Sequence, residues 1–232
     1  MVEMNKVGLL IIATNKYDVF INQLLRSVDK YFFNGHTVDI YLFVDKPYKG
    51  EHSQRLNILQ IHIKHYPFPY ATLYRYRHFT EHSIYLTSEY LFYLDVDMRI
   101  VASIGDEILP KDVSITATLH PGFYKGGGSW CTNKESKAFV CLEDRKKYYA
   151  GGFQGGTNKG FLNLAKYLNV LIQDDEKKGI MAEWHDESHL NAWLSGFRCH
   201  ELSPSYCYPE SWKLPFPKKI LALDKNHAEI RS

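Results

Sequence analysis

Runs of apolar residues alternate with amphipathic segments along the first hundred residues. Val7 to Ala13 and Val38 to Val44 are continuous apolar stretches of strand length, and a third short strand is predicted near Ile58 to Ile63. Such runs are typical of parallel strands that are covered on both faces. Between the first two runs, Tyr17 to Phe32 places apolar residues at helical spacing, which predicts a helix there.

A second helix is predicted over Tyr74 to Ser88, and a buried strand, Leu91 to Leu94, follows it. This alternation of strands and helices indicates an α/β protein with an open, mostly parallel sheet flanked by helices. Ligands in such sheets bind beyond the carboxyl ends of the strands. Ala13, Asp45 and Asp95 all lie at such ends, so we expect the binding site there.

The second half of the chain is less regular. We interpret Gly122 to Gly128 and Gly151 to Gly156 as glycine-rich loops, neither of which has the sequence of a phosphate-binding loop. Helices are predicted over Asn158 to Lys178 and within Ile180 to Gly196. Four prolines between residues 204 and 217 indicate an irregular segment that wraps the surface.

The composition fits one globular domain. The chain has 232 residues, of which 45% are hydrophobic and 23% are charged, and its net charge is +2. This balance gives no electrostatic argument for binding nucleic acid or an anionic membrane. The apolar run Val7 to Ala13 is too short for a transmembrane span or a signal sequence, so we expect a soluble, cytoplasmic protein without a membrane anchor. The sequence leaves the oligomeric state open.

Asp95-Val96-Asp97 follows the buried strand that ends at Leu94. If the chain turns at Asp95, both carboxylates can reach one divalent cation, whereas on a continuing strand they would point to opposite faces. Buried carboxylates are costly unless they are paired or bound to a metal. Oxygen ligands suit Mn²⁺ or Mg²⁺, which bridge carboxylates to phosphates. A solvated turn is the alternative, since Asp is also favoured in turns.

The segment around Trp184 carries further candidates. His185 and His189 are spaced to share a helix face, but the sequence is not H-E-x-x-H and no third ligand is apparent, which disfavours a zinc site. Asp186 and Glu187 are candidate bases, nucleophiles or charge stabilisers. A solvated acidic helix start is the alternative for these two carboxylates.

Three cations are candidates for binding a diphosphate, because Arg and Lys both recognise phosphate oxygens. They are Arg75, Lys225 and Arg231. Ordinary surface charge is the alternative for each of them.

Five segments, in this order along the chain, together resemble one known family. They are Asp95-Val96-Asp97-Met98, His120-Pro121-Gly122-Phe123-Tyr124, Tyr148 to Gly156, Trp184 to Asn191, and Lys225-Asn226-His227. From about Ile12 to Arg231 the chain is similar to glycosyltransferase family 6, which holds the histo-blood group A and B transferases, the α-1,3-galactosyltransferase and the Forssman synthase. The string W-H-D-E-S-H-L-N is the most specific part of the match.

The resemblance implies a single-domain, metal-dependent, retaining enzyme of the GT-A fold. Such enzymes transfer galactose or N-acetylgalactosamine from a UDP-sugar to the 3-hydroxyl of a β-galactoside, which belongs to an oligosaccharide, glycolipid or lipopolysaccharide. The mammalian members carry a membrane anchor and stem, so we expect this chain to be a soluble member of the bacterial or phage type. The resemblance also implies a nucleotide-sugar half over about residues 7–100 and an acceptor half over about residues 115–210. A tail, residues 223–232, is expected to be mobile without UDP.

The resemblance also assigns roles to residues. Asp95 and Asp97 are expected to bind Mn²⁺, or alternatively Mg²⁺, against the UDP diphosphate. Glu187 is the expected catalytic carboxylate, either as a nucleophile or as a stabiliser of positive charge in same-face attack. The other donor-binding positions are Ile12, Ala13, Thr14, Tyr17, Arg75, Val96, Ala150, Gly151, Gly152, His185, Asp186, Lys225 and Arg231. The acceptor-binding positions are His120, Thr132, Trp184 and Glu187.

Two segments bear on the choice of substrates, one on the donor and one on the acceptor. The small residues Ala150 and Gly152 resemble those of the blood group A enzyme and imply N-acetylgalactosamine as the donor sugar, with galactose as the alternative. The family's acceptor-side acid aligns with Pro209, so Glu210 is the candidate to replace it. A non-catalytic sugar-binding homologue and an inverting transferase remain as alternatives of other classes.

Overall fold

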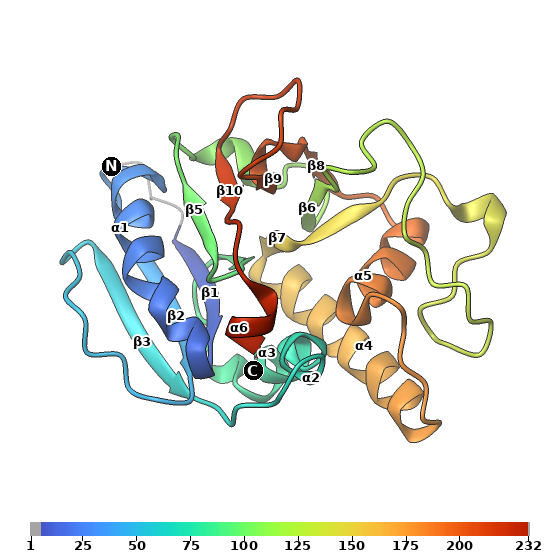
Figure 1. Cartoon of the computed structure of the whole chain (residues 1–232). Coiled ribbons are helices and arrows are strands. Elements are labelled where there is room, and N and C mark those ends of the chain that lie inside the picture. Colours follow the sequence, from blue (N-terminus) through green and yellow to red (C-terminus); the bar gives the residue numbers. More distant parts are fainter. Residues whose placement is uncertain (1–5, 232) are drawn as a thin grey trace.

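The structure, a computed structural model, describes residues 6–231, apart from the side chains of His227 and Arg231. A seven-stranded sheet with the order β3-β2-β1-β4-β7-β6-β8 runs through the molecule (Figure 1). Its strands are β1 (Val7–Ala13), β2 (Val38–Val44), β3 (Leu56–His62), β4 (Tyr90–Leu94), β6 (Ile115–Leu119), β7 (Tyr149–Thr157) and β8 (His200–Leu202). A second sheet contains β5 (Met98–Ile100), β9 (Tyr208–Pro209) and β10 (Ile220–Ala222).

The direction of the strands confirms an α/β fold with a mostly parallel sheet. β3, β2, β1 and β4 are parallel to one another. β7 is antiparallel to both of its neighbours, β4 and β6, and β8 is parallel to β6. Among the described strands of this sheet, therefore, only β7 runs against the others. The amino end of β7 consequently lies at the same edge as the carboxyl ends of the other strands.

Helices cover both faces of the sheet (Figure 1). They are α1 (Ile21–Tyr31), α2 (Tyr70–Leu73), α3 (Arg75–Glu81), α4 (Asn158–Lys177), α5 (His185–Gly196) and α6 (His227–Arg231), with the 3₁₀ helices η1 (Asn15–Phe20), η2 (Ser83–Tyr85), η3 (Asp106–Ile108), η4 (Leu142–Asp144) and η5 (Pro204–Tyr206). Leu9 and Ile11 pack into one buried cluster with α1, whereas Leu10 packs into a second cluster with α3 and α4. Successive side chains of a strand point to opposite faces, so each face of the sheet has its own core.

The strand predictions of the first half are confirmed, with a shift of one or two residues in β3. The helix predictions differ more. The segment from Tyr17 to Phe32 begins as the 3₁₀ helix η1 and becomes α-helical only at Ile21. The segment from Tyr74 to Ser88 contains only α3 and η2, which are separated where the backbone leaves helical geometry at His82, and the shorter helix α2 precedes it and ends before Tyr74.

The later predictions also shift at their boundaries. The helix expected over Asn158 to Lys178 is α4 almost residue for residue. The helix expected within Ile180 to Gly196 starts only at His185. Between the two, Gly179 has a positive φ of 69°, which glycine adopts without the strain that a Cβ would cause. The proline-rich segment is irregular as expected, but it contains η5 and β9.

The interpretation of Gly151 to Gly156 as a loop is wrong, because these residues form most of β7. The glycines are required by close packing. A Cβ on Gly155 would overlap with the ring of Phe92 and the carbonyl oxygen of Leu91, both in the neighbouring strand β4. A Cβ on Gly156 would overlap with the carbonyl oxygen of Ser114. Glycine in a strand often marks such a close approach.

No helix among residues 6–231 has both the length and the apolar character that crossing a lipid bilayer requires.

We expect Gly155→Ala to destabilise the protein by about 1–3 kcal/mol, because the added methyl group has to displace Phe92 and the backbone of β4. Chemical denaturation would measure the change in the free energy of unfolding. Gly196→Ala is the control, since nothing lies within 4 Å of the position that its Cβ would occupy. A loss of stability no larger than that of the control would contradict the prediction.

Candidate functional site

A pocket of about 160 Å³ lies beyond the carboxyl ends of β1, β3 and β4. This is the edge at which a parallel sheet is expected to bind its ligand. At this edge a hydrogen bond joins the segments that follow β1 and β2. The carboxylate of Asp45, after β2, accepts the backbone N–H of Asn15, after β1, with its two oxygens at 3.1 and 3.2 Å. The lining residues are Ile12, Thr14, Asn15, Tyr17, His65, Phe68, Ala71, Thr72, Arg75, Tyr93, Asp95, Val96, Asp97, Lys225 and Ile230.

Most of the predicted donor-binding residues line this pocket, and the structure adds others. Those that were predicted are Ile12, Thr14, Tyr17, Arg75, Asp95, Val96, Asp97 and Lys225. Ala13 instead packs into the core with 1% of its surface exposed. The side chain of Arg231 lies outside the described residues. His65 and Phe68, which sequence reasoning missed, follow the carboxyl end of β3, and that position is the signal that could have identified them.

Asp95 and Asp97 lie on a tight turn between β4 and β5, as the sequence predicted. The backbone N–H of Met98 donates to the carbonyl of Asp95 at 3.2 Å and closes the turn. The side chain of Asp95 accepts a hydrogen bond from the Tyr93 hydroxyl, and that of Asp97 pairs with the ammonium group of Lys225. Both carboxylates line the same pocket. The turn therefore presents two oxygen-donor side chains to one space.

The C-terminal segment is held against this turn. The backbone N–H of Leu223 donates to the carbonyl of Asp97 at 3.1 Å, and the ammonium group of Lys225 reaches the Asp97 carboxylate. Farther along, the ammonium group of Lys16 donates to the carbonyl of Glu229 at 3.0 Å. In Figure 1 this segment runs from β10 down to α6, which lies in front of β1 and beside the label of α3. The mobility expected for the tail without UDP stays a prediction.

The guanidinium of Arg75 is buried beside the pocket, with 5% of the residue exposed. Its Nε lies 2.9 Å from Oδ2 of Asp186, and its Nη2 lies 3.5 Å from Oδ1 of Asp95. Its Nη1 donates to the carbonyl of Gly151 at 2.8 Å. Burial alone would lower the pKa of Arg75, but the combined attraction of several neighbouring groups, Asp186 foremost and Asp95 among them, outweighs burial and raises that pKa. Arg75 is therefore a fixed positive charge at the inner wall of the pocket.

Glu187 lies in the first turn of α5 and faces the amino end of β7. The backbone N–H of Gly151 donates to its Oε2 at 2.8 Å. Burial raises the pKa of Glu187 to about 7, although the Gly151 N–H and the Tyr148 hydroxyl both act to lower it. The backbone of Gly151 thus links the two side chains, because its N–H binds Glu187 and its carbonyl binds Arg75.

The predicted sugar-selecting residues lie close by. Ala150 is buried in the core, with 3% of its surface exposed. A Cβ on Gly152 would overlap with the methyl group of Met98 and would lie 2.9 Å from Oδ2 of Asp95 and 3.6 Å from Sγ of Cys207. His185 packs edge-on against Phe68, a residue of the pocket, with 5.2 Å between ring centroids. Gly152 and His185 therefore lie next to the pocket residues Asp95 and Phe68, whereas Ala150 belongs to the core.

The predicted acceptor residues come from three separate segments. His120 directly follows β6, and its ring lies 5.7 Å from that of the fully buried Tyr148. Burial lowers the pKa of His120 to about 4, so the ring is neutral at pH 7. Its Nδ1 accepts the N–H of Gly122 at 3.1 Å, which leaves the proton on Nε2, where it can be donated to a ligand. Trp184 is 56% exposed.

Taken together, the site has two parts that share Arg75. One part is a pocket with carboxylates and cations, which suits a divalent cation and a diphosphate. The other part is Glu187, a carboxylate whose pKa of about 7 allows it to gain or lose a proton near neutral pH. A site of this kind can bind an anionic leaving group and act on the atom to which that group is bonded.

Comparisons with known proteins agree with this arrangement. The sequence profile of Glycosyltransferase family 6 matches residues 2–232. The histo-blood group ABO system transferase 1 of Rattus norvegicus is 32% identical over 242 residues, which cover 97% of this chain and 68% of the rat protein. The globoside alpha-1,3-N-acetylgalactosaminyltransferase 1 of Gallus gallus is 30% identical over 97% of this chain and 69% of its own length. The O-antigen biosynthesis glycosyltransferase WbnI of Escherichia coli is 27% identical and covers 94% of each chain.

We expect Glu187→Gln to make the protein more stable at pH 8. The pKa of Glu187 in the folded protein lies above its ordinary value of 4.5, so wild-type stability falls as the pH rises from about 4.5 through about 7. Glutamine cannot ionise, so the variant avoids this loss in the free energy of unfolding, which amounts to roughly 1–3 kcal/mol at pH 8. Denaturation at pH 5 and pH 8 would measure it. An advantage of the variant that is equal at both pH values would contradict the assignment.

Proposed function

The chain belongs to glycosyltransferase family 6, and from this premise we propose that it transfers N-acetylgalactosamine from UDP-N-acetylgalactosamine to the 3-hydroxyl of a β-galactoside, with retention of the α-configuration. Membership of the family already implies a nucleotide-sugar donor and a glycan acceptor. The name of the chicken relative, an α-1,3-N-acetylgalactosaminyltransferase, supports the sugar and the linkage.

One observation carries the proposal, namely that the pocket and Glu187 are joined through a single arginine. Arg75 contacts Asp95, which lines the pocket, and the carbonyl of Gly151, whose N–H binds Glu187. With the diphosphate in the pocket beside Arg75 and Lys225, the sugar bonded to it would lie toward Glu187. This order of groups suits a reaction that breaks the bond between the anomeric carbon and the diphosphate.

In the proposed mechanism Arg75 and Lys225 bind the diphosphate and stabilise the charge that develops as it leaves. Glu187 in its ionised form then acts at the anomeric carbon. It either forms a covalent bond there as the bond to the diphosphate breaks, and is then displaced by the acceptor hydroxyl, or stabilises the positive charge while that hydroxyl attacks from the same face. In both routes the proton of the attacking hydroxyl passes to the departing diphosphate. His120, with its proton on Nε2, would donate a hydrogen bond to the acceptor sugar. The two routes for Glu187 remain alternatives.

Asp95 and Asp97 fit a hard divalent cation, because both are oxygen donors on one turn and the Asp97 carboxylate already attracts the ammonium group of Lys225. We include Mn²⁺ in the proposal, held by these two residues. When bound, it would offset the charge of the leaving diphosphate. No three His, Cys, Asp or Glu side chains form a metal site among the described residues, so the donor phosphates would complete the coordination.

Glycine at position 152 supports N-acetylgalactosamine as the donor sugar. The neighbour that approaches this position most closely is the methyl group of Met98, which ends a flexible side chain and can move aside for an acetamido group. An alanine at this position would add its own methyl group to that space. UDP-galactose remains the alternative donor.

A donor and acceptor screen tests the proposal. The purified protein is incubated with methyl β-lactoside and either UDP-N-acetylgalactosamine or UDP-galactose, and the release of UDP and the product linkage are measured, the latter by NMR. We expect an α-1,3-linked product, faster with UDP-N-acetylgalactosamine. Glu187→Gln should lower the rate by about 10²-fold or more, whereas Glu143→Gln, an exposed control, should not. A β-linked product would rule out retention, and a faster reaction with UDP-galactose would rule out the proposed sugar.

Metal removal tests the role of the aspartates. We expect EDTA to abolish transfer and added Mn²⁺ to restore it, because the diphosphate otherwise meets two carboxylates without a cation between them. Asp95→Asn should lower the rate by about 10²-fold, whereas Asp112→Asn, on an exposed loop, should leave it unchanged. Full activity in EDTA would exclude the metal from the proposal.

A further inference from the structure

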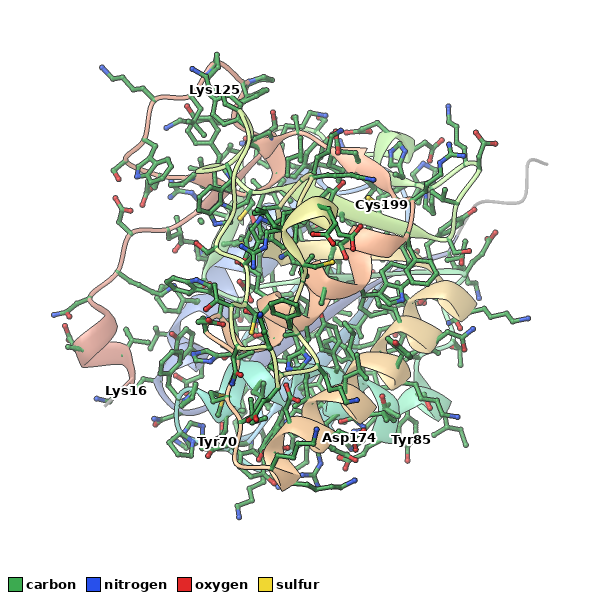
Figure 2. The ribbon with its side chains drawn as sticks, turned by 90° about the vertical axis from the view of Figure 1, so that its right-hand side faces the viewer. Lys16, Tyr70, Tyr85, Lys125, Asp174 and Cys199 are labelled. Carbon is green, nitrogen blue, oxygen red and sulfur yellow. The ribbon has the colours of Figure 1, made fainter. Side chains whose placement is uncertain are left out.

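Two carboxylates hold the loop of residues 128–140 against the chain that leads into α5. Glu183 accepts the backbone N–H of Thr132 at 2.9 Å and the Thr132 hydroxyl at 2.8 Å. Asp175, near the end of α4, accepts the hydroxyl of Ser136 at 2.6 Å and the N–H of Lys137 at 2.8 Å. Figure 2 looks onto this side of the molecule, with Lys125 at its top and Asp174, the neighbour of Asp175, at its base.

The two carboxylates differ in what they leave available. Asp175 is 1% exposed, and both of its oxygens accept hydrogen bonds from the loop. Glu183 is exposed, and both of its bonds from Thr132 go to Oε1, which leaves Oε2 without a backbone or hydroxyl donor among the described residues. Asp175 is therefore fully used within the fold, whereas the exposed carboxylate of Glu183, held by Thr132 and the Cys131 thiol, can accept a further hydrogen bond from a ligand.

Glu183 is also permanently charged. Burial would raise its pKa, but hydrogen bonds from the Cys131 thiol and from Thr132 outweigh this and lower the pKa to about 2. An ionised carboxylate only accepts hydrogen bonds, so Glu183 suits a ligand that donates them, such as a sugar hydroxyl.

Contacts connect Glu183 to the site around Glu187. Trp130, in the same loop, packs edge-on against Tyr148 with 5.2 Å between ring centroids. The Tyr148 hydroxyl interacts with the Glu187 carboxylate. Tyr148 also interacts electrostatically with Cys131, whose thiol is hydrogen-bonded to Glu183. On the other side, Trp184 directly follows Glu183, and its carbonyl accepts the N–H of Glu187 at 3.0 Å. Glu183 is therefore linked to Glu187 through Trp184 on one side and through the loop and Tyr148 on the other.

Glu210, the sequence-based candidate for the acceptor-side acid, is already occupied. Its Oε1 pairs with Arg99 at 3.0 Å, and its Oε2 accepts the backbone N–H of Asp224 at 3.3 Å. Both oxygens are thus used to join β5 to the C-terminal segment. The carboxylate that binds the acceptor has to be sought elsewhere, and Glu183 meets the requirement.

We propose that Glu183 accepts a hydrogen bond from a hydroxyl group of the acceptor sugar, next to the exposed indole of Trp184, which the family resemblance already assigns to the acceptor. This inference rests on the proposed function and specifies its acceptor side. Carboxylates bind hydroxyl donors strongly, and aromatic rings provide apolar area at low cost in entropy. The Thr132 hydroxyl is committed to Glu183, so Thr132 is a positioning residue here rather than a direct contact of the sugar.

The test compares Glu183→Gln with Glu135→Gln, an exposed glutamate of the same loop. Glutamine can still accept the Thr132 hydrogen bonds through its carbonyl oxygen but lacks the charge. We expect the KM for methyl β-lactoside to rise about tenfold in Glu183→Gln, with the KM for the donor, donor hydrolysis without acceptor and the thermal midpoint unchanged. Glu135→Gln should match the wild type. Thr132→Val should raise the acceptor KM by a smaller factor, about threefold.

An unchanged acceptor KM in Glu183→Gln would overturn the inference. So would an equal loss of donor hydrolysis, since that would mean a general structural role. A failure of the proposed function would look different, because the wild-type protein would then release no UDP with either donor. In that case saturation-transfer NMR with methyl β-lactoside still decides, as the inference requires weaker binding by Glu183→Gln than by Glu135→Gln.

Discussion

The buried guanidinium of Arg75 holds together three elements that are distant in sequence. It pairs with Asp186 on α5, contacts Asp95 after β4 and donates to the carbonyl of Gly151 in β7. Removing one partner of a buried ion pair leaves the other charge unsatisfied, typically at a cost of about 3–5 kcal/mol. The attachment of α5 to the sheet, and with it the location of Glu187, therefore depends on the same charge that faces the pocket. Stability and chemistry cannot be varied independently at this position.

The close packing of β7 complements this charge network. The absence of side chains at Gly155 and Gly156 lets β4 and Ser114 approach the strand, and the absence of one at Gly152 lets Met98 and Asp95 do so. The backbone of β7 consequently lies near enough for its peptide groups to act as ligands, and the N–H of Gly151 does so toward Glu187. A strand with ordinary side chains would keep these groups apart.

The sequence predicted those features that depend on neighbours along the chain. The apolar runs identified β1, β2 and β4, and the turn after Leu94 identified Asp95 and Asp97, because a strand and its end are local properties. The motifs also indicated the family, which is confirmed over residues 2–232, whereas the role of Glu187 stays a prediction. The strand β7 was missed because glycine has no strand preference, and only the packing of Phe92 and Ser114 reveals why it is needed. Likewise no pattern in the sequence predicts the hydrogen bond between Thr132 and Glu183, which lie 51 residues apart.

The alternation of side-chain directions along β7 limits how this strand can change. A Cβ at Gly151 would point toward Glu187 and Arg75. A Cβ at Gly152 would point toward Met98 and Cys207. Inserting or deleting one residue at the start of the strand would exchange these environments, since a shift by one residue moves a side chain to the other face. Substitutions in this part of β7 therefore keep their separate environments only while the length of the strand is fixed.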